Sequence, residues 1–230
     1  MSIADNLKRI EERISLSAEK SGRKREDITL CAVTKKVDSS ACLELMSLGA
    51  KNLAENRVQS LLEKYETIGN NADWHLIGHL QTNKVKYIAP FVKLIHSVDS
   101  IHLLKEIDLK AKANDRVIDC LVEVNVSGEE SKFGIKPDEC ESFIEKASEF
   151  KNVCLKGLMT IAPRQEKKGD NRKYFYELNK MFLDLKDKSY ENTDFKYLSM
   201  GMSLDFEEAI LEGANIVRIG TALFEGYETK

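Results

Sequence analysis

The sequence lacks the features of a membrane-bound, secreted or disulfide-bonded protein. No apolar run approaches the length needed to cross a bilayer. The first residues have neither the basic start nor the apolar centre of a signal peptide. The five cysteines are odd in number, scattered and free of any C-x-x-C pair, which is typical of buried thiols in a reducing compartment. These absences predict a cytoplasmic protein.

The chain also lacks a strong charge of either sign. Its 230 residues carry a formal net charge of −3, so the composition does not favour a nucleic acid or an anionic membrane as partner. No low-complexity tract, internal repeat or linker interrupts the sequence. We therefore expect residues 1–230 to form a single domain. Two charge-rich runs, residues 164–173 and residues 63–66, are predicted to be a surface loop and a solvated helix face.

What the sequence contains is a strict alternation of strand-like and helical segments. Alternating β and α units predict a parallel sheet, and eight of them predict an α/β protein with a single (β/α)8 TIM barrel. The alternative is an open doubly wound sheet, but no G-x-G-x-x-G motif follows the first strand. An extra N-terminal helix is expected over roughly residues 4–21. The strands are expected at residues 28–33, 51–54, 74–78, 92–97, 117–126, 153–161, 195–200 and 216–220, and the helices between them at residues 38–49, 57–68, 82–89, 100–113, 137–150, 171–188 and 204–212.

The first strand ends in two lysines. Residues 28–36 (ITLCAVTKK) form an apolar run that stops at Lys35 and Lys36. The chemistry of α/β barrels lies at the C-terminal ends of the strands. Because successive side chains of a strand point to opposite faces, only one of the two lysines can face the mouth of the barrel. On this stretch alone, two solvated lysines that close the strand are the stronger interpretation.

The last two β/α units have the pattern of a phosphate site. Residues 199–205 (SMGMSLD) form a Ser/Gly loop before a helix, and residues 217–222 (VRIGTA) form an apolar strand that ends in Gly-Thr. Barrels often bind phosphate with the loops after strands seven and eight, where backbone N–H groups and hydroxyls suit a dianion. The alternative is an ordinary N-cap at Ser203 and a closing turn. Arg218, among apolar neighbours, needs a polar partner.

A mouth lysine and a phosphate loop together suggest a ligand with an aldehyde at one end and a phosphate at the other. A lysine in a desolvated pocket condenses with carbonyl groups. Pyridoxal 5′-phosphate (PLP) fits this description, and so does the sugar-phosphate substrate of a Schiff-base aldolase.

No metal site is predicted. His75 and His79 are four residues apart, but on a strand this spacing separates them by about 13 Å, too far to share one ion. His79 is expected to line a pocket, and His75, His96 and His102 to be structural. The polar loop over residues 123–134 (EVNVSGEESKFG) places Asn125 near the mouth and is weak support for a site.

Eight motifs, in order along the whole chain, carry a family resemblance. They resemble those of the pyridoxal phosphate homeostasis protein family, PLP-binding proteins related to the alanine racemase N-terminal barrel. The sequence departs from the family pattern at Ala54, at residues 37–38 and at Glu225. The motifs are AVTK (32–35), ENRVQ (55–59), WHLIGHLQTNK (74–84), HSVD (96–99), NVSGEESKFG (125–134), GLMTI (157–161), LSMGMSLD (198–205) and VRIGT (217–221).

This resemblance implies a fold-type-III PLP barrel with the cofactor held as a Schiff base on Lys35. It also implies that Arg218 faces the pyridine nitrogen of the cofactor. The remaining implied cofactor contacts are Ser203, Gly220 and Thr221 at the phosphate, and Asn56 and Met159 around the ring.

The resemblance also bears on activity. An arginine at the pyridine nitrogen keeps that nitrogen unprotonated and weakens the ring as an electron sink. Racemases of this fold take an opposing base from a second domain, which we expect to be absent because the sequence stops at Lys230. We therefore expect a monomeric, non-catalytic PLP carrier in PLP homeostasis, with PLP-dependent enzymes as recipients. The alternative is a PLP-dependent amino-acid racemase or lyase.

Overall fold

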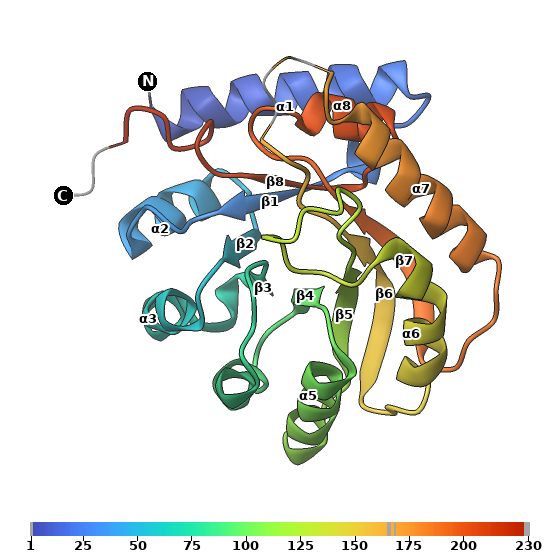
Figure 1. Ribbon diagram of the computed structural model, residues 1–230. Helices are drawn as coiled ribbons and strands as arrows, with labels where there is room; N and C mark the ends of the chain where they lie inside the picture. The colour runs from blue at the N-terminus through green and yellow to red at the C-terminus, as the bar shows by residue number, and fades with distance from the viewer. Residues whose placement is uncertain (1, 165–166, 168, 228–230) are drawn as a thin grey trace.

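Parallel strands close into a barrel in the computed structural model, which describes residues 2–164, 167 and 169–227. Within these residues eight strands pair in chain order, and the last pairs with the first to complete the ring (Figure 1). The predicted (β/α)8 TIM barrel is confirmed. The strands are β1 Thr29–Val33, β2 Asn52–Glu55, β3 Asp73–Leu76, β4 Leu94–Val98, β5 Ile118–Glu123, β6 Val153–Met159, β7 Thr193–Ser199 and β8 Ile216–Ile219.

Helices surround the barrel and cover its outer face (Figure 1). None of the helices in the described residues is both long and apolar enough to cross a membrane. Part of the surface loop predicted at residues 164–173 lies outside the described residues. The helices are α1 Ile3–Lys20, α2 Ser39–Ser47, α3 Val58–Ile68, α4 Val85–Ile88, α5 Ile101–Ala113, α6 Cys140–Ala147, α7 Arg172–Lys186 and α8 Phe206–Leu211, with short 3-10 turns η1 Arg25–Asp27, η2 Gly69–Asn71, η3 Thr82–Lys84 and η4 Pro137–Glu139.

The extra N-terminal helix is present as α1, which packs beside α8 at one edge of the barrel (Figure 1). It begins with a capping box, in which Ser2 Oγ accepts a hydrogen bond from Asp5 N at 3.1 Å and the Asp5 carboxylate accepts one from Ser2 N at 3.1 Å. Leu7, Ile10 and Ile14 are buried at helical spacing, as the sequence predicts. Leu16, in contrast, is exposed.

Several boundaries differ from those expected. β5 ends at Glu123 instead of continuing to residue 126, because Asn125 starts a turn: its Oδ1 accepts hydrogen bonds from Gly128 N at 3.1 Å and Ser127 Oγ at 3.0 Å. The last helix, α8, begins at Phe206, and its N-cap position is Asp205 instead of Ser203. The helix expected over residues 82–89 is divided into η3 and the single turn α4.

Two apolar cores hold the barrel. The larger lies between the strands and the helices and includes Trp74, Phe175 and Phe206. The smaller fills the barrel itself, and its members alternate along the strands, as inward-facing side chains do. All five cysteines are free and four of them are buried, consistent with their prediction as thiols in the core. The inner core comprises Cys31, Val33, Ala54, Ile77, Leu94, Leu121, Met159 and Ile216.

Candidate functional site

The two lysines after β1 lie at the mouth where the C-terminal ends of the strands meet. Cys31 and Val33 point into the barrel, but Lys35 and Lys36 follow β1 in a turn that the hydrogen bond from Val37 N to Thr34 O closes at 3.0 Å, so the alternation along the strand does not extend to them. Both lysines are exposed. The choice of Lys35 over Lys36 therefore rests on the resemblance of residues 32–35 to the family motif.

A buried ion pair holds the residue that precedes Lys35. Thr34 Oγ1 donates a hydrogen bond to Glu55 Oε1 at 2.6 Å, and the Lys64 ammonium donates to Thr34 O at 2.7 Å and to the Glu55 carboxylate. Glu55 is 0% exposed and Lys64 is 6% exposed. We call Thr34, Glu55 and Lys64 the Glu55 cluster. It fixes both the side chain and the carbonyl group of Thr34.

The Glu55 cluster was not predicted from the sequence. Residues 63–66 are predicted to be a solvated helix face, and for Lys64 this prediction is wrong. A signal was present in the spacing, because Lys64 is three residues after Leu61 and four before Ile68, on the same buried stripe of α3.

The two loops of the expected phosphate site meet each other and the end of β1. Ala222 N donates a hydrogen bond to Ser203 Oγ at 3.2 Å and so joins the loop after β8 to the loop after β7. A Cβ atom on Gly220 would lie 2.9 Å from Val33 O, so a glycine is needed where the last strand passes the first. Ser203 and Gly220 are half-buried and Thr221 is exposed, which leaves all three accessible from the mouth.

Arg218 has the polar partners that its buried position requires. It is 3% exposed, and its guanidinium donates to Ser199 Oγ at 2.6 Å and to Thr160 O at 2.8 Å. Burial lowers the pKa of Arg218, while the nearby Cys31 thiol and the Glu123 carboxyl act in the opposite direction. A guanidinium stays protonated in proteins and has only donors, so Arg218 remains a cation that offers N–H groups.

A chain of hydrogen bonds continues from Arg218 across the barrel interior. Ser199 Oγ lies 3.0 Å from His96 Nδ1, His96 Nε2 lies 2.9 Å from His75 Nδ1, and His75 Nε2 lies 3.2 Å from Asn52 Oδ1. Since Arg218 donates to Ser199, the Ser199 hydroxyl donates onward to His96, and each histidine then donates from Nε2. We call these five residues the Arg218 chain. One guanidinium therefore sets the tautomer of both histidines.

Burial keeps both histidines neutral. It lowers the pKa of His75 to about 4, with a smaller effect from Lys93, and it lowers the pKa of His96 well below the usual value, with additional repulsion from His75 and Arg218. Donor atoms of Cys31, His75 and His96 lie within 4.8 Å of one another. However, the imidazole nitrogens are already hydrogen-bonded, and burial raises the pKa of the Cys31 thiol to about 12. These hydrogen bonds and the burial are consistent with the prediction that His75 and His96 are structural.

Glu123 is an acidic group for which no role was predicted. It ends β5, is 4% exposed, and has its pKa raised to about 7, chiefly by burial and then by the negative charge of Asp99, while Arg218 acts in the opposite direction. Met159 is paired with it in register and lies fully buried in the inner core. A carboxyl group that titrates near neutrality therefore lies at the end of a barrel strand.

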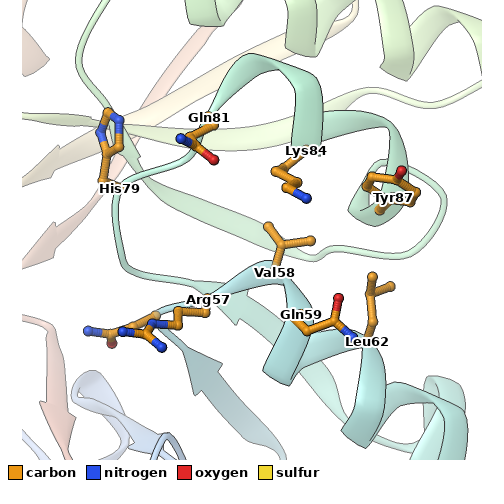
Figure 2. A pocket seen from close by; sticks show the side chains of 9 residues that line it. Arg57, Val58, Gln59, Leu62, His79, Gln81, Lys84 and Tyr87 are labelled. Carbon is orange, nitrogen blue, oxygen red and sulfur yellow. The ribbon is translucent and has the colours of Figure 1, made fainter.

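A groove with a volume of about 400 Å³ begins beside Asn56, just after β2, and passes between α3 and the η3–α4 segment (Figure 2). His79 is one of its lining residues, as predicted, whereas His75 lies inside the barrel, so these two histidines do not share a site. His102 is exposed on α5.

The sequence matches the family described as alanine racemase, N-terminal domain, over residues 5–228. It is 45% identical over 225 residues to the pyridoxal phosphate homeostasis protein of Aquifex aeolicus, covering 97% of this chain and 98% of that relative. The protein of the same name from Escherichia coli K12 is 33% identical over 96% of this chain and 95% of its own length. The chain belongs to the pyridoxal phosphate homeostasis protein family.

Solved structures place this family member among barrels of the same shape. PipY of Synechococcus elongatus without PLP superposes with a TM-score of 0.86 at 29% identity, covering 97% of this chain and all (100%) of PipY. PipY with PLP bound superposes with a TM-score of 0.80 at 29% identity, covering 94% and 99% of the two chains. An alanine racemase of Clostridium difficile, at 18% identity and a TM-score of 0.69, shares the barrel fold over 99% of this chain and 57% of its own.

Proposed function

We propose that this protein binds PLP as a Schiff base on Lys35 and acts in intracellular PLP homeostasis. The observation that carries the proposal is the close approach of the first and last strands. A Cβ atom added to Gly220 would lie 2.9 Å from Val33 O. A lysine and a phosphate-type loop thereby share one mouth. The curated relatives are named for PLP homeostasis, and PipY has a structure with PLP bound.

The residues present fit the cofactor. The Ser203 hydroxyl and the backbone around Gly220 and Thr221 supply donors for a dianionic phosphate. Arg218 has N–H groups to offer the pyridine nitrogen, which accepts a hydrogen bond only when unprotonated. Asn56 and Met159 are assigned to the surroundings of the ring, because each lies at the end of a barrel strand. PLP supplies an aldehyde that an amine can capture.

We further propose that the protein carries PLP rather than turning over amino acids. A donating Arg218 weakens the ring as an electron sink, and the named relatives are homeostasis proteins. The proposal includes a cytoplasmic, monomeric, single-domain protein whose PLP passes to PLP-dependent enzymes.

One observation favours a second candidate function, a PLP-dependent racemase or lyase. That chemistry needs an acid or base at the mouth in addition to Lys35, and Glu123, with a pKa of about 7, has the proton affinity of such a group. Steady-state turnover of L-alanine or L-serine that is lost in Glu123→Gln but not in Asp99→Asn would favour the enzyme over the carrier.

The deciding experiment is the visible absorption spectrum of the purified protein with PLP, before and after borohydride, followed by peptide mass mapping. We expect a yellow protein that bleaches on reduction and carries the pyridoxyl group on Lys35. Lys36→Ala is the matched control and should behave like the wild type, whereas Lys35→Ala should lose the reducible signal. A colourless protein that takes up no PLP would contradict the proposal and favour the aldolase.

A further inference from the structure

The groove beside Asn56 has rigid walls. A Cβ atom on Gly78 would lie 2.3 Å from Asn56 O, so only glycine allows the loop after β3 to touch the loop after β2. Ser97 Oγ donates a hydrogen bond to Gly78 O at 2.6 Å and anchors that loop from β4. The His79 ring stacks on Phe133 with 4.0 Å between centroids, which fixes the end of the groove nearest the mouth. The groove is therefore a preformed site.

Its lining is basic although the protein is acidic. Arg57 and Lys84 line it together with amide side chains that include Gln59 and Gln81, and no lining residue is an aspartate or glutamate. Within the described residues, neither Arg57 nor Lys84 forms an ion pair, and the whole chain has a net charge of −3. A local basic concavity on such a chain attracts anions.

The arrangement of the two cations indicates an elongated anion. Arg57 lies with His79 at the end near the mouth, while Lys84 extends from the opposite wall toward α3, closer to Leu62 and Tyr87 (Figure 2). A guanidinium binds a carboxylate through two parallel hydrogen bonds, and an ammonium acts as a point charge. The apolar side chains suit a short carbon chain between two acidic groups. A compact phosphate would need both cations to converge at one point.

We propose that this groove is a second ligand site, which binds a small dicarboxylate with one carboxylate on Arg57 and the other on Lys84. The site does not depend on PLP. Asn56 belongs both to the groove and to the proposed surroundings of the cofactor ring, so a bound dicarboxylate changes the affinity for PLP. By linkage, PLP changes the affinity for the dicarboxylate by the same factor. This coupling, unlike the groove site, rests on the proposed function.

Isothermal titration of the PLP-free protein with succinate, acetate and inorganic phosphate tests the site. We expect succinate to bind at least tenfold more tightly than acetate or phosphate. Arg57→Gln and Lys84→Gln should each weaken succinate binding by roughly 10- to 100-fold, the effect of losing a charge-assisted hydrogen bond. Lys105→Gln is the matched control: it removes the same charge from the exposed surface of α5, outside the groove, and should keep the wild-type affinity.

A residue-specific readout accompanies the titration. In amide NMR spectra, succinate should shift the side-chain signals of Gln59 and Gln81, whereas those of Asn114, on the far end of α5, should stay in place. The proposal is overturned if succinate produces no heat and no shifts, if Arg57→Gln and Lys84→Gln bind it as the wild type does, or if phosphate binds as tightly through the same residues. A protein that binds succinate but not PLP would retain the groove site and overturn the proposed function alone.

Discussion

The protein has two buried polar clusters, the Glu55 cluster and the Arg218 chain, and their charges are compensated in different ways. In the Glu55 cluster the ammonium of Lys64 meets the carboxylate of Glu55, so the two charges cancel. In the Arg218 chain the guanidinium has neutral direct partners, a hydroxyl and a backbone carbonyl, followed by two neutral histidines. The Glu55 cluster has no net charge, whereas the Arg218 chain leaves a positive charge in the barrel.

This difference explains what each cluster contributes. Buried ion pairs add little net stability, because desolvation offsets their attraction. The Glu55 cluster therefore matters through geometry: it fixes Thr34, the residue before Lys35. The Arg218 chain matters through its positive charge and its N–H donors. Its neutral hydrogen-bond partners stabilise the cationic guanidinium without cancelling its charge. The following experiments break these two arrangements or change Glu123, a carboxyl group whose pKa burial raises and the charge of Arg218 lowers.

The largest effect is expected from breaking the ion pair. Glu55→Ala or Lys64→Met leaves a buried charge without its partner and should lower the free energy of unfolding by about 3–5 kcal/mol. The double variant removes both charges and should be more stable than either single variant. Urea denaturation measures all three. Glu106→Ala, which removes the half-exposed pair with Lys110, is the control and should cost less than about 1 kcal/mol. If the double variant lost as much free energy of unfolding as the two single variants together, the result would contradict the ion-pair interpretation.

Low pH should destabilise the fold through His75 of the Arg218 chain. His75 has a pKa of about 4 in the fold and about 6.5 when unfolded, so between these values the unfolded chain binds the additional proton. The contribution of neutral His75 to the free energy of unfolding is complete above pH 6.5 and is lost as the pH falls to 4, a change of about 3 kcal/mol. His75→Gln should flatten the pH dependence of unfolding over this window, while His102→Gln, on the exposed face of α5, should leave it unchanged. Equal slopes in both variants would refute the assignment.

Glu123 should respond in the opposite direction. Its pKa is about 7 in the fold and about 4.5 when unfolded, so the fold binds the additional proton, and this stabilisation is lost as the pH rises from 4.5 to 7. Glu123→Gln keeps a neutral side chain at every pH. Compared with the wild type, it should gain up to about 3 kcal/mol between pH 4 and pH 8 in urea unfolding. A constant difference between the two proteins would show that Glu123 titrates normally.

The smallest effect is expected from cutting the Arg218 chain at its hydroxyl. Ser199→Ala removes the acceptor of Arg218 and the donor to His96, and should destabilise the fold by about 1–3 kcal/mol. It also frees the tautomer of His96, which ¹⁵N NMR of the imidazole nitrogens can detect. Ser199→Thr retains the hydroxyl and serves as the control for the tautomer. An unchanged tautomer in Ser199→Ala would contradict the direction of hydrogen bonding that we infer.

The fold could be predicted because each β/α unit carries its own signal. Strand and helix periodicities are local, and eight repeats of one alternation leave few topologies. The need for a partner at Arg218 was also predictable, because a charge among apolar residues cannot be left unsatisfied. That the partners are Ser199 and the carbonyl of Thr160 depends on strand register and barrel closure, which no local pattern reveals.

The remaining features of the site arise where separate strands meet. Glu123 acquires its raised pKa from burial and from Asp99 on a neighbouring strand end, so its sequence context gives no indication of it. Leu43 and Leu48 of the second helical segment are exposed because the buried stripe of α2 passes through Ala41, Cys42 and Leu45. In both cases the deciding information is the direction in which a side chain points once the ring is closed.

The contact between Gly220 and Val33 has a consequence for the timing of biosynthesis. Lys35 is translated well before Ser203, Gly220 and Thr221, and β8 is the strand that pairs with β1 and brings the last two of these residues to it. Long-range strand pairing of this kind forms late, because the chain between must first be ordered. Until β8 has been translated, a nascent chain therefore exposes its lysine without the loops beside it. The complete site appears only when the final strand enters the ring.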